Sequence, residues 1–129
     1  MILGVDPGTR KVGFAVLDES GRTHDLGIEP LAEFAARARA LLEQWAFAAI
    51  AVGTGTNART LGSELANLGI PVTYVDERET TLRARARFFD DHPPRGWRKL
   101  IPRGMLLPDR PIDDYAALLI AERYLRPGV

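Results

Sequence analysis

The sequence predicts an α/β domain in which a mixed five-stranded sheet carries helices on both faces. Three short apolar runs follow one another within the first 30 residues, and their connections are too short to hold helices. From residue 31 onward, segments with helical spacing alternate with short apolar runs. Strands joined by tight turns pair antiparallel, whereas strands separated by helices pair in parallel. The expected sheet is therefore an antiparallel meander of three strands extended by parallel strands.

Each expected strand is a short apolar run bounded by turn-forming residues. The first two runs are separated by Pro7-Gly8, a dipeptide that favours a sharp turn. The run at residues 49–53 contains no polar side chain, as expected of a strand that is covered on both faces. In chain order, the expected strands are residues 2–6, 12–17, 22–28, 49–53 and 71–75.

The expected helices are segments in which apolar residues recur every three or four positions. Gly69 is expected to close the second helix in a left-handed conformation, and Pro111 is expected to open the last one. Between the last two helices, residues 92–110 hold four prolines and two glycines and show no period, which predicts a long functional loop. In chain order, the expected helices are residues 31–45, 59–68, 81–89 and 111–125.

Composition limits the chemistry that the chain can perform. The 129 residues form one expected domain, 1–129, and they include no cysteine and only two histidines. Disulfides, thiolate metal sites and a cysteine nucleophile are thereby excluded. No signal peptide or membrane-spanning run is visible, so a cytoplasmic location without a membrane partner is expected. A bound metal would be held mainly by carboxylates, which favours magnesium or manganese over zinc.

Positive charge is concentrated in one part of the chain, although the formal net charge is zero. Residues 78–110 contain nine basic residues and four acidic ones. Arginine accounts for 15 of the 17 basic residues, and its guanidinium group suits bidentate phosphate contacts. Nucleic acid is the expected partner. Phosphate contacts are expected from basic side chains at the first turn and in the basic segment, namely Arg10, Lys11, Arg83, Arg98, Lys99 and Arg103.

Three acidic residues lie at strand ends or at a helix start, where residues remote in sequence can meet. Asp6 ends the first expected strand, Glu77 follows the fifth, and Asp113 lies in the first turn of the last expected helix. Two divalent ions about 4 Å apart need shared carboxylates, and they activate water and stabilise the leaving oxygen at phosphorus. The pattern therefore predicts a nuclease in which these three residues are catalytic metal ligands.

Each acid also has a purely structural explanation. Asp-Pro-Gly is an ordinary turn sequence, and Glu77 could simply precede a helix capped by Thr80 or Thr81. Asp113 and Asp114 both suit the positive end of a helix dipole. Asp113 is expected to point toward the protein body, because it shares a helical stripe with Ala117, Ile120 and Tyr124. Asp114 raises the same question, because it shares a stripe with Leu118, Ala121 and Leu125.

Three motifs together resemble the YqgF (RuvX) family, which is related to the RuvC resolvase within the ribonuclease H-like superfamily. They are Gly4-Val-Asp6-Pro-Gly8-Thr-Arg10 through Gly13-Phe-Ala15, then Val75-Asp-Glu77-Arg78-Glu-Thr80-Thr81, and Ile112-Asp113 with Ala116-Ala117 through Tyr124-Leu125. The resemblance spans nearly the whole chain in order. One departure follows the fourth strand, where the family usually has Leu-Pro and this chain has Thr54-Gly-Thr56.

The resemblance implies a ribonuclease H-like fold and a nuclease that uses two Mg²⁺ or Mn²⁺ ions. Its substrate would be branched DNA, resolved as a Holliday junction, or precursor rRNA, processed at the 5′ end of pre-16S rRNA. Asp6, Glu77 and Asp113 match the family's acidic positions, and Arg10, Arg78 and Thr81 also match. Arg78 and Thr81 are accordingly expected to contact nucleic acid.

Two other functions fit parts of the pattern. One is a non-catalytic nucleic-acid-binding module of the same fold, which the presence of all three acids disfavours because clustered carboxylates repel phosphate. The other is a lobe of an ATPase or sugar kinase, but those proteins resemble two-lobe clamps and 129 residues make one lobe. A homodimer is expected if the substrate is a four-way junction, which needs two symmetric cuts. Apolar contacts for it would come from Trp97, Met105, Leu106 and Leu107.

Overall fold

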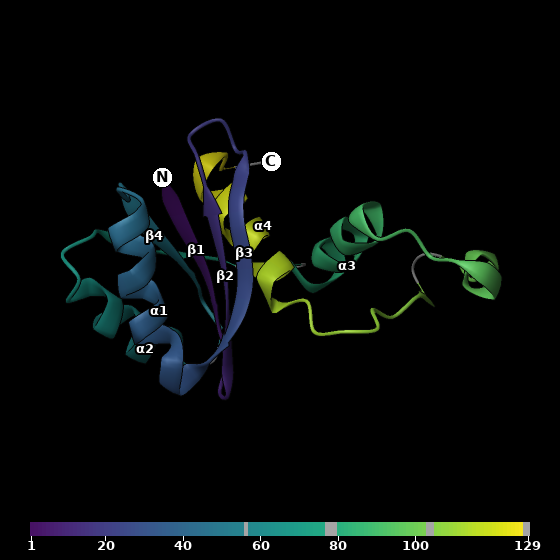
Figure 1. Ribbon diagram of the computed structural model, residues 1–129, viewed down its shortest axis with the longest axis horizontal. Helices are drawn as coiled ribbons and strands as arrows, with labels where there is room; N and C mark the ends of the chain where they lie inside the picture. The colour runs from purple at the N-terminus through teal and green to yellow at the C-terminus, as the bar shows by residue number, and fades with distance from the viewer. Residues whose placement is uncertain (56, 77–79, 103–104, 128–129) are drawn as a thin grey trace.

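The computed structural model contains one central sheet with helices on both faces (Figure 1). It describes residues 1–55, 57–76, 80–102 and 105–127, although not the side chain of Thr81. Among these residues, no helix is both long enough and apolar enough to cross a membrane.

The sheet has five strands in the order β3-β2-β1-β4-β5. β1 pairs antiparallel with β2 and parallel with β4, and the outer pairs are antiparallel β2-β3 and parallel β4-β5. This topology confirms the predicted meander followed by parallel strands. The strand bounds are β1 Ile2–Pro7, β2 Lys11–Leu17, β3 Thr23–Pro30, β4 Ala49–Gly53 and β5 Val72–Val75.

The helices divide between the two faces of the sheet. Helices α1 (Leu31–Gln44) and α2 (Ala58–Ala66) cover one face, and α4 (Asp113–Leu125) covers the other (Figure 1). Helix α3 (Thr80–Asp91) packs against α4 rather than lying flat on the sheet. The face under α4 therefore has a single covering helix, and α3 extends that layer outward.

Apolar side chains alternate between the two faces of the central strands and form a core on each side. Leu3, Val5 and Phe14 belong to the core beneath α1 and α2. Ile2 and Ala15 belong to the core beneath α4, which also includes Phe88 of α3. Since successive side chains of a strand point to opposite faces, the strand pattern in the sequence accounts for both layers.

Helix α4 lies unusually close to β1 because Gly4 has no side chain. A Cβ atom added at Gly4 would lie 2.3 Å from the carbonyl oxygen of Ala117 and 2.7 Å from the Cβ of Ala121. Any larger residue at this position would push the helix off the sheet. Gly4 and Asp6 are two residues apart on β1, so Asp6 belongs to the same face, at the end of the strand.

The structure corrects three details of the expected elements. Pro111 does not open the last helix, which begins at Asp113 with Ile112 as its N-cap. The loop at residues 92–110 is not structureless, because it contains a 3₁₀ helix, η1, at Gly96–Leu100. β3 extends to Pro30 because its pairing with β2 continues as far as Lys11. By contrast, Gly69 does have a positive φ of 83°, as predicted.

Polar and aromatic contacts fasten α3 to α4. Both guanidinium amino groups of Arg87 donate to the carboxylate of Glu122, at 2.8 and 2.9 Å. The pKa of Arg87 is raised, chiefly by this hydrogen bond. The rings of Phe88 and Tyr115 meet edge to face at a centroid distance of 5.7 Å. The position of α3 is therefore fixed by α4, whose first turn contains Asp113.

Candidate active site

Gly13 brings Asp6 and Asp113 to the same place. Asp6 of β1 is paired directly with Gly13 of β2, and residues paired in this way have Cα atoms about 4.5–5.5 Å apart. A Cβ atom added at Gly13 would lie 1.9 Å from the carbonyl oxygen of Asp113. The first residue of α4 thus sits on the backbone of β2 beside the end of β1. Two predicted ligands that are remote in sequence become neighbours.

The ends of β4 and β5 lie at the same edge of the sheet as Asp6. Val52 is paired with Val5, and Gly53 is paired with Val75, so the three parallel strands end at one level. The backbone N–H of Thr54 donates to the carbonyl oxygen of Val75 at 3.1 Å. Glu77 follows two residues later and lies outside the described residues, as does Arg78. Its predicted role as the third ligand remains a prediction.

Lys11 places a positive charge against Asp113. Its Nζ lies 3.1 Å from Oδ2 of Asp113, whose side chain is 31% exposed. Lys11 is two residues before Gly13 on β2, so it shares the face covered by α4. The carboxylate of Asp113 therefore already accepts a cationic group at this edge and retains contact with solvent. An oxygen donor set that is partly open to water is suited to a hard divalent cation.

The turn between β1 and β2 is tied to the loop after β4. A Cβ atom added at Gly8 would lie 2.4 Å from the carbonyl oxygen of Lys11, so the turn requires glycine. The side-chain amide of Asn57 donates to the carbonyl oxygen of Gly8 at 3.2 Å. Asn57 has a φ of 66°, in the left-handed region that asparagine tolerates. Asn57 is not among the predicted site residues, because an asparagine before a helix ordinarily indicates only a cap.

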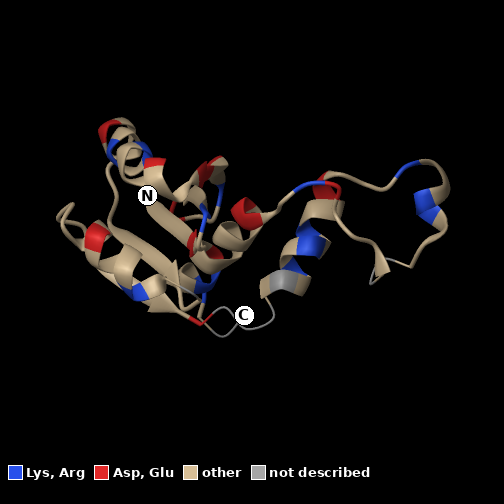
Figure 2. Cartoon of the chain, turned by 90° about the horizontal axis from the view of Figure 1, so that it is seen from below, with Lys and Arg blue, Asp and Glu red and all other residues tan. Residues whose placement is uncertain are grey.

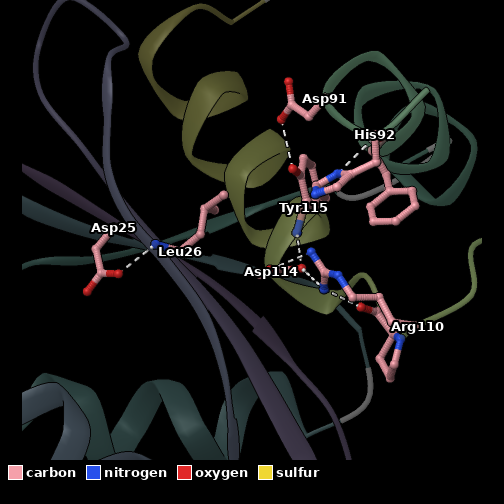
Figure 3. A network of polar contacts seen from close by, with 9 residues as sticks. Asp25, Leu26, Asp91, His92, Arg110, Asp114 and Tyr115 are labelled. Atoms are coloured by element: carbon pink, nitrogen blue, oxygen red, sulfur yellow. Dashed lines mark hydrogen bonds and ion pairs between the residues drawn. The ribbon is translucent and has the colours of Figure 1, made fainter.

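Asp114 is the inward-pointing acid of the last helix, and the prediction that Asp113 fills this role needs correction. Asp114 is 6% exposed, and its Oδ1 accepts the N–H of Tyr115 at 3.0 Å. Arg110 lies 3.4 Å from its Oδ2 (Figure 3). Farther along α4 both stripes are buried, since Ala117 and Ala121 are each 0% exposed, so only the contacts of the first turn distinguish the two acids. The carboxylate of Asp114 is therefore occupied by Arg110 and the backbone of Tyr115, whereas Asp113 faces the sheet edge.

A second acid-tyrosine contact links α3 to α4 next to Asp114. The hydroxyl of Tyr115 donates to Oδ2 of Asp91 at 2.7 Å (Figure 3). The ring of His92 stacks on Phe88 at a centroid distance of 4.6 Å, and Arg110 lies over the same phenylalanine ring. Burial raises the pKa of Tyr115 to about 12, and the hydrogen bond to Asp91 adds to this shift.

The raised pKa of Tyr115 predicts how stability changes at high pH. The folded protein retains the phenolic proton to about pH 12, whereas the unfolded chain loses it near the ordinary value of 10. Because the folded state binds the extra proton, the contribution of Tyr115 to the free energy of unfolding is complete below pH 10 and declines as pH rises toward 12. In a titration of tyrosinate absorbance, Tyr115→Phe is expected to remove the step with the highest pKa. Retention of that step in the variant would contradict the assignment.

The predicted phosphate-binding residues lie on several different elements. Arg10 is exposed at the first turn, and its backbone carbonyl oxygen accepts the N–H of Leu31. Arg83 is exposed on α3 and lines a cavity of about 400 Å³ between α3 and α4. Arg98 and Lys99 lie in η1, away from the sheet. Arg103 and the side chain of Thr81 fall outside the described part of the chain.

The structure places two of the three predicted metal ligands at one sheet edge. Among the described residues, no group of three or more acidic or histidine side chains is arranged to hold a metal ion. The backbones of Asp6 and Asp113 meet at one sheet edge through Gly13, and β5, which precedes residues 77–79, ends at the same edge. The donors present are carboxylate oxygens, which fit Mg²⁺ or Mn²⁺.

Solved structures with a related fold include both a resolvase and kinases. The RuvC structure from Thermus thermophilus aligns with a TM-score of 0.52 at 20% identity and covers 99% of this chain and 96% of that one. This likeness confirms the ribonuclease H-like fold. A candidate sugar kinase from Cytophaga hutchinsonii has a TM-score of 0.44 at 14% identity, over 66% of this chain. A ROK family glucokinase from Streptomyces griseus has a TM-score of 0.45 at 18% identity, over 67%.

Coverage differs sharply between these structures. The chain spans 38% and 36% of the two kinase chains.

No curated protein matches the sequence. A family model described as RuvX, Holliday junction resolvase, matches residues 1–127, which is nearly the entire chain. A nuclease-type role agrees with both the family and the fold. The chain therefore belongs to the RuvX family of Holliday junction resolvases.

Proposed function

We propose that the chain is a nuclease that hydrolyses phosphodiester bonds in structured nucleic acid and depends on two Mg²⁺ or Mn²⁺ ions. The observation that carries the proposal is the contact of Gly13 with the backbone of Asp113, which sets Asp113 beside Asp6. The start of a helix and the end of a strand meet here without an intervening side chain. Such close approach serves two carboxylates that must share a ligand.

Asp6, Glu77 and Asp113 would hold the ions at the edge formed by β1, β4 and β5. Bound ions supply a water of lowered pKa and stabilise charge on the leaving oxygen. Lys11 neutralises Asp113 through the 3.1 Å ion pair and thereby lowers the repulsion between neighbouring carboxylates. Its ammonium group and the exposed Arg10 are placed to bind a phosphate at the same edge.

The substrate is either branched DNA or precursor rRNA, and the two differ in what they require of the protein. Resolving a four-way junction needs two symmetric cuts and hence a two-fold dimer. Trimming the 5′ end of pre-16S rRNA needs one active site. The dimer and the rRNA substrate are both proposals that a cleavage panel can separate.

A cleavage panel tests this function directly. A four-way DNA junction, single-stranded DNA, duplex DNA and a precursor 16S rRNA fragment are incubated with Mg²⁺, with Mn²⁺ and with a chelator. Cleavage of a structured substrate is expected with either metal and is expected to disappear with the chelator. Binding without cleavage under every metal condition would instead identify the chain as a non-catalytic nucleic-acid-binding module. Cleavage that persists in the chelator would contradict the metal dependence.

A further inference from the structure

The segment between α3 and α4 projects from the body of the protein (Figure 1). It exposes large apolar side chains. We call its described residues, 93–102 and 105–110, the distal arm. Its apolar residues are far more exposed than is usual for their type: Trp97 72%, Leu100 87%, Met105 73% and Leu107 63%. Several large apolar side chains exposed on one projecting segment indicate a surface that binds another molecule.

Contacts at the base of the arm hold this surface in place. Leu106 is 1% exposed and belongs to the core shared by α3 and α4, which corrects its predicted role as a free apolar contact. The guanidinium group of Arg98 donates to the carbonyl oxygen of Leu107 and so connects η1 to the returning chain. The arm is therefore rooted on one side, while Trp97 and Leu100 remain in solvent.

Charge on the arm favours a polyanion as the partner. Arg95 and Lys99 lie two residues on either side of Trp97, and both are exposed. Figure 2 shows basic positions, in blue, along this projecting segment. The described arm contains four basic residues and one acidic residue, Asp109. A second copy of the chain would bring two arms of like charge together, which opposes association. Nucleic acid instead offers phosphates to the cations and flat bases to the indole.

We propose that the distal arm binds unpaired bases of a nucleic-acid substrate. Trp97 stacks on an exposed base, and Arg95 and Lys99 bind the phosphates that flank it. The inference rests on the proposed function insofar as the substrate is nucleic acid. The distal arm would be a binding site separate from the carboxylate edge. It would recognise bases that are not enclosed in a continuous duplex.

The arm is within reach of the candidate active site along the chain. Leu107 precedes Asp113 by six residues, so the two lie at most about 20 Å apart even if the connection is fully extended. This distance is equivalent to about six nucleotides along one DNA strand, at about 3.4 Å each. A strand held at Asp6 and Asp113 can thus reach the base of the arm at Leu107, and Trp97, farther out in η1, would meet bases farther along the same strand. The arm would direct cleavage to positions close to a branch or a single-stranded end.

Tryptophan fluorescence can report this stacking because the chain has only two tryptophans. In a Trp45→Phe background, Trp97 is the sole tryptophan reporter. The protein is titrated in chelator, where the proposed cleavage does not proceed, with a four-way junction, single-stranded DNA and a continuous duplex. Saturable quenching is expected with the junction and the single strand, and much weaker quenching with the duplex. Equal quenching by all three would contradict recognition of unpaired bases.

Two tryptophan variants and one control separate stacking from a general loss of structure. Stacking of one base contributes enough that Trp97→Ala is expected to weaken binding of single-stranded DNA by about 5- to 100-fold, measured by anisotropy of a labelled strand. Trp97→Tyr is expected to restore most of the affinity. Leu82→Ala serves as the control, because Leu82 is 64% exposed but lies on α3. Circular dichroism is expected to show the same fold for all three.

The flanking cations are tested by salt dependence. Each phosphate contact contributes about 0.7 to the slope of log affinity against log salt for a single strand. Arg95→Gln and Lys99→Gln are each expected to lower that slope by about this amount. An unchanged slope in both variants would show that the arm does not bind phosphates.

Two results would overturn the proposal. One is unaltered nucleic-acid binding by Trp97→Ala. The other is conversion of a dimer to a monomer by this variant in sedimentation, with binding unchanged, since the arm would then join two copies of the chain. These readouts are independent of cleavage. If the metal panel showed no cleavage, single strands would still be expected to quench Trp97. If single strands did not quench Trp97, metal-dependent cleavage would still be expected.

Discussion

Asp6→Asn is expected to reduce metal-dependent cleavage by about a hundredfold or more while the protein still folds and binds nucleic acid. The substitution keeps the size of the side chain but removes the negative charge that a divalent ion requires. Asp6 is half-buried at the end of β1 and paired with Gly13, so the amide can occupy the same space. Cleavage rates and nucleic-acid affinity, measured on the same preparation, check this result.

Matched substitutions determine whether the loss is specific to the sheet edge. Asp113→Asn is expected to behave like Asp6→Asn. Glu43→Gln removes an equal charge from an exposed position near the end of α1, on the opposite face of the sheet, and is expected to leave cleavage unchanged. Asp114→Asn is expected to lower the melting temperature more than the rate per folded molecule, because Asp114 bonds Arg110 and the Tyr115 backbone. Full cleavage by purified Asp6→Asn would end the nuclease proposal.

Gly13→Ala is expected to destabilise the protein by about 2–3 kcal/mol and to abolish most of the cleavage. The added methyl group would lie 1.9 Å from the carbonyl oxygen of Asp113 and 2.8 Å from the backbone N of Asp114. Both neighbours are backbone atoms at the start of α4, so the helix itself must move to relieve the clash. Moving it separates Asp113 from Asp6. Chemical denaturation and the cleavage assay measure the two effects.

A second glycine provides a control for loss of stability alone. Gly69→Ala adds a methyl group with nothing within 4 Å, but at a φ of 83° that disfavours alanine by roughly 1–2 kcal/mol. Gly69 lies after α2, remote from the contact between β2 and α4. This variant is expected to cleave normally below its melting temperature. If Gly13→Ala also retained normal cleavage when folded, the contact at Gly13 would not position the carboxylates.

Much of the fold could be read from local patterns because those patterns reflect burial. The apolar run at 49–53 became β4 with the predicted bounds, and the close spacing of the first three runs did produce an antiparallel meander. Helix boundaries were less certain. Pro111 has the fixed φ typical of a first helical residue, yet α4 starts two residues later, where it packs on Gly13. Tertiary packing overrode the local preference at that point.

The roles of Asp113 and Asp114 could not be assigned from periodicity. Each acid shares a helical stripe with apolar residues, and both stripes are buried in the structure, so periodicity alone does not distinguish them. The structure buries Asp114 against Arg110 and Tyr115, and it pairs Asp113 with Lys11. The spacing of four residues between Arg110 and Asp114 was the available signal for the first contact. No local signal joins Lys11 to Asp113, which are 102 positions apart in the sequence.

The sequence by itself determined the order of strands and helices, the carboxylate and arginine chemistry, and the family, because these depend on residue identity and local spacing. Only the tertiary structure decided which residues meet. It set Asp113 beside Asp6 through a glycine contact, rooted Leu106 in the core and left Trp97 exposed on the arm. The physical reason is that close packing is a property of surfaces brought together from remote segments, and one missing methyl group at Gly13 fixes where a whole helix lies.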